Sequence, residues 1–581
     1  MKVSQKGLLL SENALTVLKK RYLKKNKEGR IIETPFEMFK RVARNIASAD
    51  LIYDKGANIK KREEEFLAIM VNLEFLPNSP ALMNAGRELQ QLAACFVLPV
   101  EDSLSSIFDT IKHTALIHQS GGGTGFSFSK LRPANDRVLS TSGIASGPVS
   151  FMKVFNMATE VIKQGGTRRG ANMGILRVDH PDIIDFVRAK DDPKELTNFN
   201  ISVGVTDEFM NAVETGRVYY LINPRDKKKV KRLSAVKVFD IIVVSAWRSG
   251  EPGIIFLDRI NKDNPTPDIG EIEATNPCGE QPLLPFESCN LGSINLSKMV
   301  IKKYRGCEID YKRLEEVIRI GVRFLDNIID VNRYPLPEIE RITKGNRKIG
   351  LGVMGFADML IKLGIPYDSE EAIDQADRVM GFIRRISDEV SSEIARERGP
   401  YPHFFQVRNK KRGSQAMRNA ARTTVAPTGT LSIIANCSSG IEPLYGIAYV
   451  RTVMNDIRLF EVNPIFLEMA KERSFYSKGL IGLLSKQESI RELEDIPEDI
   501  RRLFVTSHDI SPEFHVRMQA AFQRHTDNAV SKTINFPNIA ARGDIKRAFL
   551  LAYKEGCKGI TIYRSGAREK QVLACKNIQY C

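Results

Sequence analysis

Apolar residues recur along the chain with two different periods, and the change between them falls near residue 85. Residues 35–43 and 63–72 carry apolar side chains at intervals of three and four, which predicts amphipathic helices. From residue 94 onward, short apolar runs such as 241–244 and 253–257 alternate with helical patterns, which predicts strands in an α/β body. The sequence therefore predicts a helical N-terminal region followed by one long α/β domain.

Length and composition limit the class of protein. The chain has 581 residues, of which 43% are apolar, and no apolar run approaches the length of a membrane-spanning helix. Residues 1–20 lack the apolar core of a secretory signal peptide. The eight cysteines are too few for a disulfide scaffold of this size. We therefore expect a cytoplasmic protein without membrane contact, in which any disulfide is transient and catalytic.

The net charge of +16, from 86 Lys and Arg against 70 Asp and Glu, favours anionic partners. The charges are scattered, and the densest basic run, residues 225–232, is typical of an exposed loop without a zinc-finger or RNA-recognition motif. We expect no nucleic-acid partner, and a phosphorylated small molecule explains a positive site equally well. The seven histidines lack the spacing of metal ligands, so no intrinsic metal site is predicted.

The segment Asn276-Pro277-Cys278-Gly279-Glu280 has the composition of a reaction centre. Proline fixes its own φ and glycine tolerates unusual backbone angles, so the segment predicts a tight loop that presents one thiol between an amide and a carboxylate. Glu280 is a candidate general base, and Cys278 a candidate nucleophile or, after one-electron oxidation, a thiyl radical. The alternative is a turn that contains a buried cysteine.

Three glycine-rich segments have the backbone freedom to approach phosphates. Residues 120–125 follow a predicted helix over residues 102–119, and they either end that helix or bring the backbone close to a ligand. Residues 423–434 read as a strand, a turn and the start of a helix whose N–H groups suit a diphosphate, or as a plain capped helix. Residues 163–172 combine glycines with cations and indicate a ligand-sensing loop or a solvated turn.

These segments occur in the order found in ribonucleotide reductase catalytic chains, which the sequence resembles over nearly its whole length. The resemblance rests on P-N-S-P at 77–80 before Cys95, G-G-T-R-R-G-A-N at 165–172, N-P-C-G-E at 276–280, E-S-C-N-L-G-S-I-N-L at 287–296 and P-T-G-T-L at 427–431. Residues 526–535 and 556–564 are similar to the adenosylcobalamin-dependent (class II) branch of that family.

The resemblance implies a ten-stranded α/β barrel of two half-barrels, with the N-P-C-G-E segment on a finger loop through its centre. It implies that adenosylcobalamin, a cobalt cofactor, supplies a radical that takes hydrogen from Cys278, and that the resulting thiyl abstracts the 3′-hydrogen of a ribonucleotide. Glu280 would accept the 3′-OH proton, and Asn276 would orient the substrate. Cys95 and Cys289 would reduce the intermediate and end as a disulfide, with Cα atoms within about 7 Å.

The resemblance also implies where ligands bind. Expected substrate contacts are Ser79, Ala94, Cys95, Gly123, Asn276, Cys278, Glu280 and a diphosphate cradle of Pro427, Thr428, Gly429, Thr430 and Leu431. A deoxynucleotide effector site at a homodimer interface is expected at Asp102, Ser103, Leu104, Arg132 and Val138, with Gln164 and Arg168 on the loop that joins effector to substrate.

The expected domains are a helical N-terminal region (residues 1–85), the catalytic barrel (86–565) and a redox tail (566–581). Cys575 and Cys581 in this tail would pass electrons from a thioredoxin-like protein, although a C-x-x-C spacing is commoner. The alternative is two cysteines on a disordered end. The N-terminal region is too short for the ATP-binding regulatory module of some relatives, so overall control by dATP is not expected.

Other classes of protein stay open beside this interpretation. In a class I catalytic subunit a separate protein supplies the radical through a tyrosine pair, and the single Tyr580 disfavours that class. A glycyl-radical enzyme is disfavoured because its C-terminal loop signature is missing. A nucleotide-binding sensor without catalysis is disfavoured because every reaction-centre residue is present. The sequence does not decide between diphosphate and triphosphate substrates.

Overall fold

Helices make up the chain before residue 75, as the apolar spacing predicts. The computed structural model describes residues 8–138, 143–162, 170–304, 306–407, 415–454, 457–567 and 573–574. The N-terminal elements are α1 (Glu12–Val17), a π-helical turn (Leu18–Tyr22), α2 (Pro35–Ala47), α3 (Asp50–Tyr53) and α4 (Ile59–Val71). Thr34 and Glu37 form a capping box at the start of α2. The buried face of α2 packs on α4 and on α12 (Tyr311–Val331), which anchors this region to the rest of the chain.

Parallel strands form the first half of a barrel. They are β2 (Cys95–Leu98), β3 (Gly123–Ser127), β6 (Asn172–Arg177), β7 (Phe199–Val205) and β10 (Gly253–Phe256), and each pairs with the next. Parallel neighbours need a crossover connection, and helices provide it here. The crossovers contain α6 (Leu104–Gln119), α7 (Gly147–Ile162), α8 (Ile183–Arg188), and α9 (Asp207–Glu214) with α10 (Ala235–Ser249).

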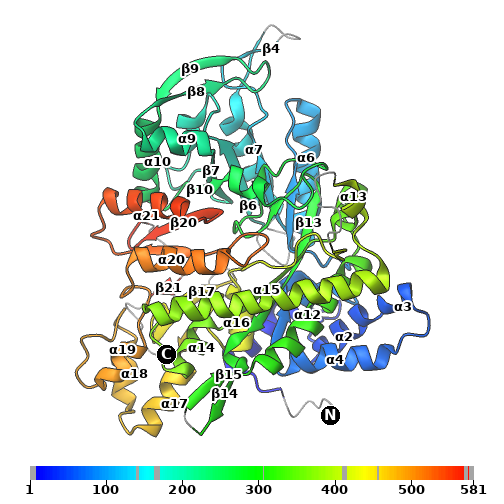
Figure 1. The fold of residues 1–581 in the computed structure, drawn as a ribbon, viewed down its shortest axis with the longest axis vertical. Coiled ribbons are helices and arrows are strands. Elements are labelled where there is room, and N and C mark those ends of the chain that lie inside the picture. Colours follow the sequence, from blue (N-terminus) through cyan, green and yellow to red (C-terminus); the bar gives the residue numbers. More distant parts are fainter. Residues whose placement is uncertain are drawn as a thin grey trace.

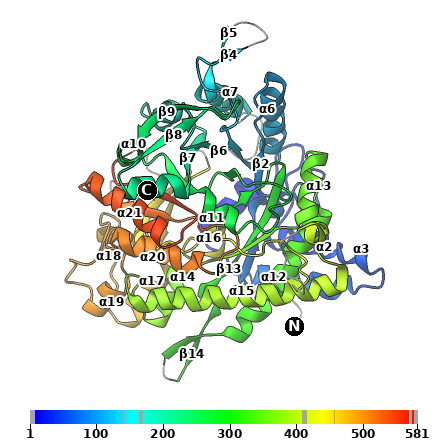
Figure 2. The same cartoon turned by 45° about the horizontal axis from the view of Figure 1, so that its top comes forward.

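The second half-barrel closes the ring. Its members are β13 (Glu287–Asn295), β16 (Ile349–Met354), the segment 423–425, β19 (Thr533–Phe536) and β20 (Gly559–Arg564). β16 runs parallel to β13, β20 runs parallel to β19, and parallel bridges at Thr423 and Val425 connect the two pairs. Antiparallel pairing of β13 with β2 and of β20 with β10 joins the halves. Five segments from each half give the ten-stranded barrel that the resemblance implies (Figures 1 and 2).

The predicted strand at residues 241–244 is wrong, because these residues lie inside α10. One face of α10 is buried at Val238, Phe239, Ile242 and Val243, so apolar residues recur here at the spacing of a helix. Four consecutive apolar residues fit a buried helix as well as a buried strand. The strand predicted at 253–257 is confirmed as β10.

Further elements cover the barrel. Before β2 lie β1 (Phe75–Pro77), which pairs with β13, and α5 (Ser79–Asn84). Between the barrel strands lie the hairpins β4–β5 (Arg137–Val138, Gly143–Ile144), β8–β9 (Val218–Ile222, Lys229–Ser234) and β14–β15 (Val300–Lys303, Gly306–Ile309), and the helices α11 (Leu257–Lys262), α13 (Pro337–Asn346), α14 (Phe356–Leu363) and α15 (Glu370–Arg398). After residue 428 follow α16 (Gly429–Ala435), β17 (Ala448–Val453), β18 (Ile457–Val462), α17 (Pro464–Glu472), α18 (Lys478–Leu484), α19 (Glu498–Leu503), α20 (Pro512–Gln523), α21 (Arg542–Lys554) and β21 (Leu573–Ala574). The long helix α15 crosses the lower half of the molecule and packs on α12 and α20 (Figure 1).

Buried apolar side chains form separate cores outside and inside the barrel. One core joins the N-terminal helices to α12, α14 and α15, and a second lies between the first half-barrel and its helices α6, α7, α10 and α21. A third and smaller core fills the barrel interior and includes Cys95, Cys289 and Leu283. Packed side chains therefore fill part of the barrel interior.

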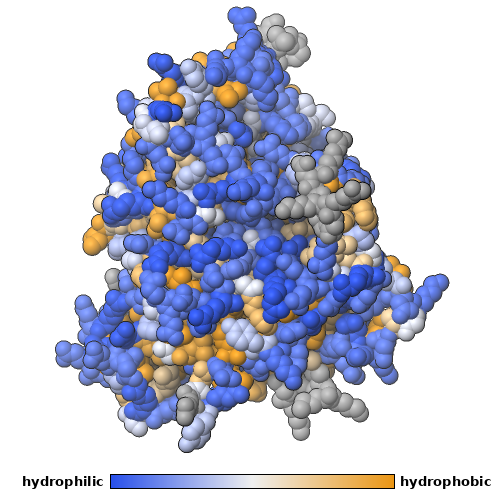
Figure 3. Space-filling model, viewed as in Figure 1, coloured by the Kyte–Doolittle hydropathy of each residue, from blue (hydrophilic) through white to orange (hydrophobic). Residues whose placement is uncertain are grey.

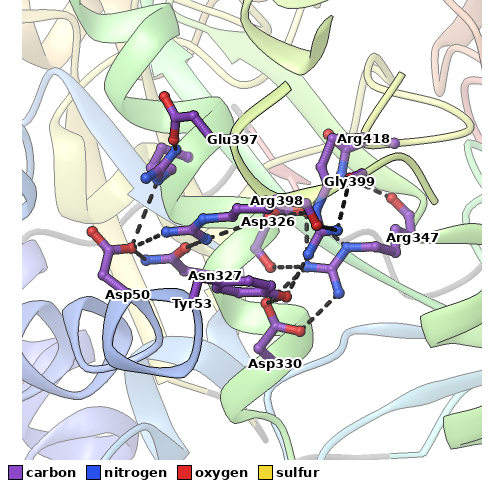
Figure 4. A network of polar contacts seen from close by, with 12 residues as sticks. Asp50, Tyr53, Asp326, Asn327, Asp330, Arg347, Glu397, Arg398, Gly399 and Arg418 are labelled. Carbon is purple, nitrogen blue, oxygen red and sulfur yellow. Dashed lines mark hydrogen bonds and ion pairs between the residues drawn. The ribbon is translucent and has the colours of Figure 1, made fainter. Parts of the chain in front are cut away.

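A buried network of charges connects the N-terminal helices to the barrel (Figure 4). Asp326 on α12 accepts hydrogen bonds from Arg347 at 2.9 Å and from Arg418 at 3.3 Å. Arg398 at the end of α15 donates to Asp50 of α3. Burial raises the pKa of Asp326, but the surrounding guanidinium groups outweigh it and hold the pKa below its ordinary value. Loss of one partner would leave a buried charge uncompensated, so this network fixes how the two regions pack.

The surface is mostly hydrophilic on the face drawn in Figure 3, with scattered apolar patches in its lower half. None of the helices within the described residues is both long and apolar enough to cross a bilayer.

Candidate active site

A short hairpin passes through the middle of the barrel. It consists of β11 (Ala274–Thr275) and β12 (Pro282–Leu283), and β11 contacts β2, β3 and β6. The approach depends on Gly125 of β3, because a Cβ atom there would lie 1.7 Å from the carbonyl oxygen of Thr275. The predicted finger loop is therefore present, and a glycine on the barrel wall makes room for it.

The tip of the hairpin presents Cys278. Gly279 has a φ of +81° and donates its N–H to the carbonyl of Asn276 at 3.0 Å, which closes a tight turn. Asn276 and Glu280 on either side are buried, whereas the Cys278 side chain is exposed to an adjoining cavity. The predicted loop geometry is confirmed, and the chemical role of the thiol stays a prediction.

Asn276 and Glu280 are tied to the barrel on both sides. The amide of Asn276 donates to Cys95 Sγ at 3.1 Å and accepts the N–H of Gln281 at 3.0 Å. The backbone carbonyl of Glu280 accepts from Ala529 N at 3.0 Å and from Thr424 Oγ1 at 2.8 Å. The loop is thus held between the two half-barrels, so its side chains have fixed positions relative to both.

Cys95 and Cys289 lie directly opposite each other on β2 and β13. Directly opposed residues of antiparallel strands have Cα atoms about 4.5–5.5 Å apart, within the range that a disulfide spans. The structure shows this pair in its dithiol form. Burial, together with the carboxylate of Glu287, raises the pKa of Cys289 well above its usual value, so this side chain is a thiol at neutral pH.

A cavity of about 820 Å³ begins at the hairpin tip. Pro277, Cys278 and Gly279 form one wall, and Pro427 and Ser432 border it near α16. It continues to α1, to the β17–β18 hairpin and to β20. This volume lies at the upper end of the range for small-molecule sites, and the exposed thiol opens into it.

The predicted phosphate cradle lies at the start of α16, as residues 423–434 indicate. Gly429 begins the helix, and no atom lies within 4 Å of the position of a Cβ at this residue, so its backbone is accessible. Thr428 adopts a φ of +53°, and its hydroxyl accepts the N–H of Gly440 at 2.7 Å. Its side chain therefore helps to hold the turn.

The other predicted substrate residues lie near the cysteine pair. Gly123 is the register partner of Cys95 on β3, and its N–H donates to the carbonyl of Ala94 at 2.9 Å. Ser79 begins α5 and shares a hydrogen bond of 2.8 Å with the hydroxyl of Tyr22. The barrel brings Ala94, Cys95 and Gly123 together with Cys289, and Tyr22 fixes the Ser79 hydroxyl.

Of the predicted effector residues, five lie within the described part of the chain and two lie outside it. Asp102 accepts from the backbone N–H of Arg132 at 3.1 Å and from its Nε at 2.8 Å. Ser103, and not Asp102, caps α6, and Leu104 begins that helix with an exposed side chain. Val138 lies on β4, which pairs with β5. Gln164 and Arg168, like the tail residues Cys575 and Cys581, lie outside the described residues.

The sequence did not reveal several residues that hold the hairpin tip in place or lie beside the cysteine pair. Asn200 on β7 donates its amide to the carbonyl of Pro277 at 2.8 Å, and Thr424 holds the carbonyl of Glu280. Lys348 forms a buried ion pair of 2.8 Å with Glu287, two residues before Cys289. No local motif marks these residues, because each reaches the site from a segment distant in sequence.

Comparisons with known proteins identify related chains. Residues 93–416 and 410–563 match the ribonucleotide reductase barrel domain, and residues 8–90 match the ribonucleotide reductase all-alpha domain. A vitamin B12-dependent ribonucleoside-diphosphate reductase of Thermoplasma acidophilum is 49% identical over 97% of this chain and 80% of its own length. One of the same description from Mycobacterium tuberculosis is 50% identical over 98% of this chain and 81% of its own length. An Actinobacillus ureae class Id ribonucleotide reductase alpha subunit superposes with a TM-score of 0.78 at 20% identity, covering 97% of this chain and 99% of that one, which supports the fold.

Proposed function

The chain belongs to the ribonucleotide reductase family, and from that membership we propose that it reduces ribonucleotides to 2′-deoxyribonucleotides for DNA synthesis with adenosylcobalamin as cofactor. Both relatives of about 50% identity carry a vitamin B12-dependent description. The observation that carries the proposal is one exposed thiol, Cys278, at the centre of the barrel beside an opposed cysteine pair.

The cavity wall beyond Cys278 fits a large polar cofactor. Arg451 and Glu461 line it, and their Nε and Oε1 atoms are buried without a hydrogen-bond partner among the described residues. Buried polar atoms without partners cost free energy, and a polar ligand that fills the cavity would satisfy them. When bound, adenosylcobalamin supplies the radical by cleavage of its cobalt–carbon bond.

Cys278 is the residue that acts on the substrate in this proposal. Its thiol gives up a hydrogen atom, and the sulfur radical then removes the 3′-hydrogen of a ribonucleotide in the cavity. Glu280 accepts the proton of the 3′-OH, and Asn276 keeps the reacting end of the substrate in place. The geometry supports these roles because all three residues lie on one five-residue turn that is held to both half-barrels.

The cysteine pair supplies the electrons. The 2′-OH leaves as water, and Cys95 and Cys289 deliver two electrons and two hydrogens, so that the pair ends as a disulfide. The opposed register of the two residues and the thiol form of Cys289 support this step. A thioredoxin-like dithiol then restores the pair, with Cys575 and Cys581 as the proposed carriers. A cytoplasmic location is part of the proposal, because this exchange needs reducing surroundings.

Substrate phosphates bind at residues 427–431 in this proposal. The open backbone at Gly429 supports it, because N–H groups at the beginning of a helix attract anions. Thr430 and Leu431 continue the first turn of α16. Pro427 borders the cavity that contains Cys278, so one ligand can reach both places.

Deoxynucleotide effectors and a homodimer complete the proposal. The helices α6 and α7 pack together and leave apolar side chains exposed on their outer faces, namely Leu104, Phe108, Leu116, Val154, Met157 and Val161. Exposed apolar side chains gathered on neighbouring helices are typical of a protein interface. Asp102 and Arg132 lie beside the start of α6, so an effector bound there would be close to the partner subunit.

The test is an anaerobic assay of deoxynucleotide formation with and without adenosylcobalamin. We expect product only when the cofactor is present, and diphosphates and triphosphates are compared as substrates in the same assay. Product formed without the cofactor but with an added radical-generating subunit would support a class I enzyme instead. Binding of nucleotides without product under any of these conditions would support a sensor.

A further inference from the structure

A buried ion pair lies beside the cysteine pair. The ammonium of Lys348 contacts the carboxylate of Glu287 at 2.8 Å, and neither side chain is more than 1% exposed. Glu287 precedes Cys289 by two residues on β13, so both side chains point to the same face of the strand. The register of β13 with β16 pairs Asn290 with Ile349, which makes Lys348 the neighbour of Cys289. A positive and a negative charge thus lie next to one sulfur of the proposed redox pair.

The segment 346–348 is built to hold this ion pair in place. Asn346 donates to Glu287 Oε1 at 2.6 Å, while Lys348 contacts Oε2. Arg347 between them turns the opposite way and binds Asp326 and Asp330, as Figure 4 shows. Its φ of +49° is unusual for a residue other than glycine, and the charge network holds it there. The network that packs the N-terminal helices on the barrel therefore also fixes the charges beside Cys289.

The two cysteines have different surroundings. Cys289 Sγ is directed at the backbone carbonyls of Asn290 and Lys348, at 3.4 and 3.5 Å. Cys95 Sγ instead contacts the amide of Asn276 on the hairpin, whose next residues form the cavity wall. Cys95 therefore contacts the hairpin that borders the cavity, whereas Cys289 lies next to Lys348.

We propose that Lys348 is a positioning residue for the redox half-reaction, and that its charge, balanced by Glu287, stabilises Cys289 as the leaving thiolate when the Cys95–Cys289 disulfide is opened. This inference rests on the proposed function of the cysteine pair. Within the described residues, the charges that act most strongly on the Cys289 sulfur are Glu287, Lys348 and Glu280.

The exchange proceeds in two steps that balance. A thiolate of the external dithiol attacks Cys95 Sγ, a new S–S bond forms there, the Cys95–Cys289 bond breaks, and its electron pair leaves on Cys289 Sγ. The second thiolate of the reductant then closes its own disulfide and releases Cys95 as a thiolate. The reductant loses two electrons, and the two protons from its thiols go to Cys95 and Cys289.

The charges around the leaving sulfur have opposite effects on this rate. Burial and the carboxylates of Glu287 and Glu280 raise the pKa of Cys289, whereas Lys348 lowers it. A thiol of higher pKa leaves more slowly. With a Brønsted coefficient of about 0.5, loss of the Lys348 charge slows the exchange roughly 3- to 10-fold.

The experiment follows rereduction of the intact enzyme by dithiothreitol. Enzyme is first allowed to turn over without reductant, mass spectrometry confirms the Cys95–Cys289 disulfide, and the rate of thiol recovery is then measured at one pH. We expect Lys348→Met to slow recovery roughly 3- to 10-fold and Glu287→Gln to accelerate it, because each removes a charge of opposite sign. Lys348→Arg, which keeps the positive charge, should recover at close to the wild-type rate.

Lys190→Met is a matched control. It breaks another largely buried ion pair, in which Lys190 contacts Glu251 at 2.8 Å, and it should not change the rate of thiol recovery. If Lys348→Met does not fold, the direction of the Glu287→Gln effect decides alone, because glutamine keeps the shape of the side chain. Equal or slower recovery in Glu287→Gln would overturn the inference. Absence of the disulfide after turnover of the wild type would overturn the proposed redox pair itself, which is a different result.

Discussion

The hairpin can occupy the barrel only because residue 125 has no side chain, and Gly125→Ala tests this directly. The added Cβ would lie 1.7 Å from the carbonyl oxygen of Thr275, whereas real Cβ contacts do not fall below 3.0 Å. Hairpin and strand must therefore separate by about 1.3 Å, the difference between these two values. Both sides of the contact are backbone in strands, so no flexible side chain can absorb the shift.

A shift of the hairpin also displaces the reaction-centre residues at its tip. Asn276 follows Thr275 and donates to Cys95 Sγ at 3.1 Å, so the shift breaks this contact and moves Cys278. A displacement of about 1 Å at reacting groups costs roughly 100-fold in rate, and overpacking of an interior costs about 1–3 kcal/mol of stability. We therefore expect Gly125→Ala to fold with a lowered urea midpoint and to lose about 100-fold in ribonucleotide reduction.

The assay compares anaerobic turnover and urea unfolding of this variant with those of Gly381→Ala. Gly381 lies in the interior of α15, where an added Cβ meets His525 at an ordinary distance of 3.4 Å. That substitution should raise stability by roughly 0.5–1 kcal/mol and leave turnover unchanged. Wild-type activity in Gly125→Ala would show that the hairpin does not cross the barrel at this point.

Three further predictions concern other parts of the site. Thr428→Ala leaves the N–H of Gly440 without its acceptor and should cost about 1–3 kcal/mol in thermal unfolding, whereas Thr428→Ser keeps the acceptor and should be tolerated. Burial raises the pKa of Asp358 from the ordinary 3.8 to about 6, so the wild type should lose roughly 3 kcal/mol of stability as pH rises from about 4 to above 6. Urea midpoints of Asp358→Asn at pH 4 and pH 8 should lack that fall. Arg168→Ala should flatten the change in substrate base preference that deoxynucleotide effectors cause, typically 5- to 150-fold, and basal reduction should persist; an unaltered response in a competition assay would argue against the loop.

Local chemistry explains why much of the site was predictable. The loop around Cys278 follows from the properties of proline and glycine, and the structure places Gly279 at a positive φ as expected. The helices at 35–43 and 63–72 follow from their apolar spacing, because each buries one face. These features depend on neighbours in sequence, so the sequence contains the information.

Other features depend on strands that meet only in the folded barrel. Residues 241–244 look like a strand until the helix around them is known, because a short apolar run has no period of its own. The hydroxyl of Thr428 accepts the N–H of Gly440, which follows α16 in the sequence, and no local motif indicates this contact. Lys348 carries no motif, and its place beside Cys289 results from the pairing of β13 with β16.

The central claim is that the thiol of Cys278 starts the reduction of ribonucleotides, and Cys278→Ser tests it most directly. Wild type and variant are assayed anaerobically with adenosylcobalamin, reductant and substrate, and deoxynucleotide is measured by mass spectrometry. Circular dichroism and urea unfolding confirm that both proteins fold alike, as expected for an exposed side chain at a turn. The account predicts product from the wild type and none from Cys278→Ser, and substantial deoxynucleotide formation by the variant would contradict it.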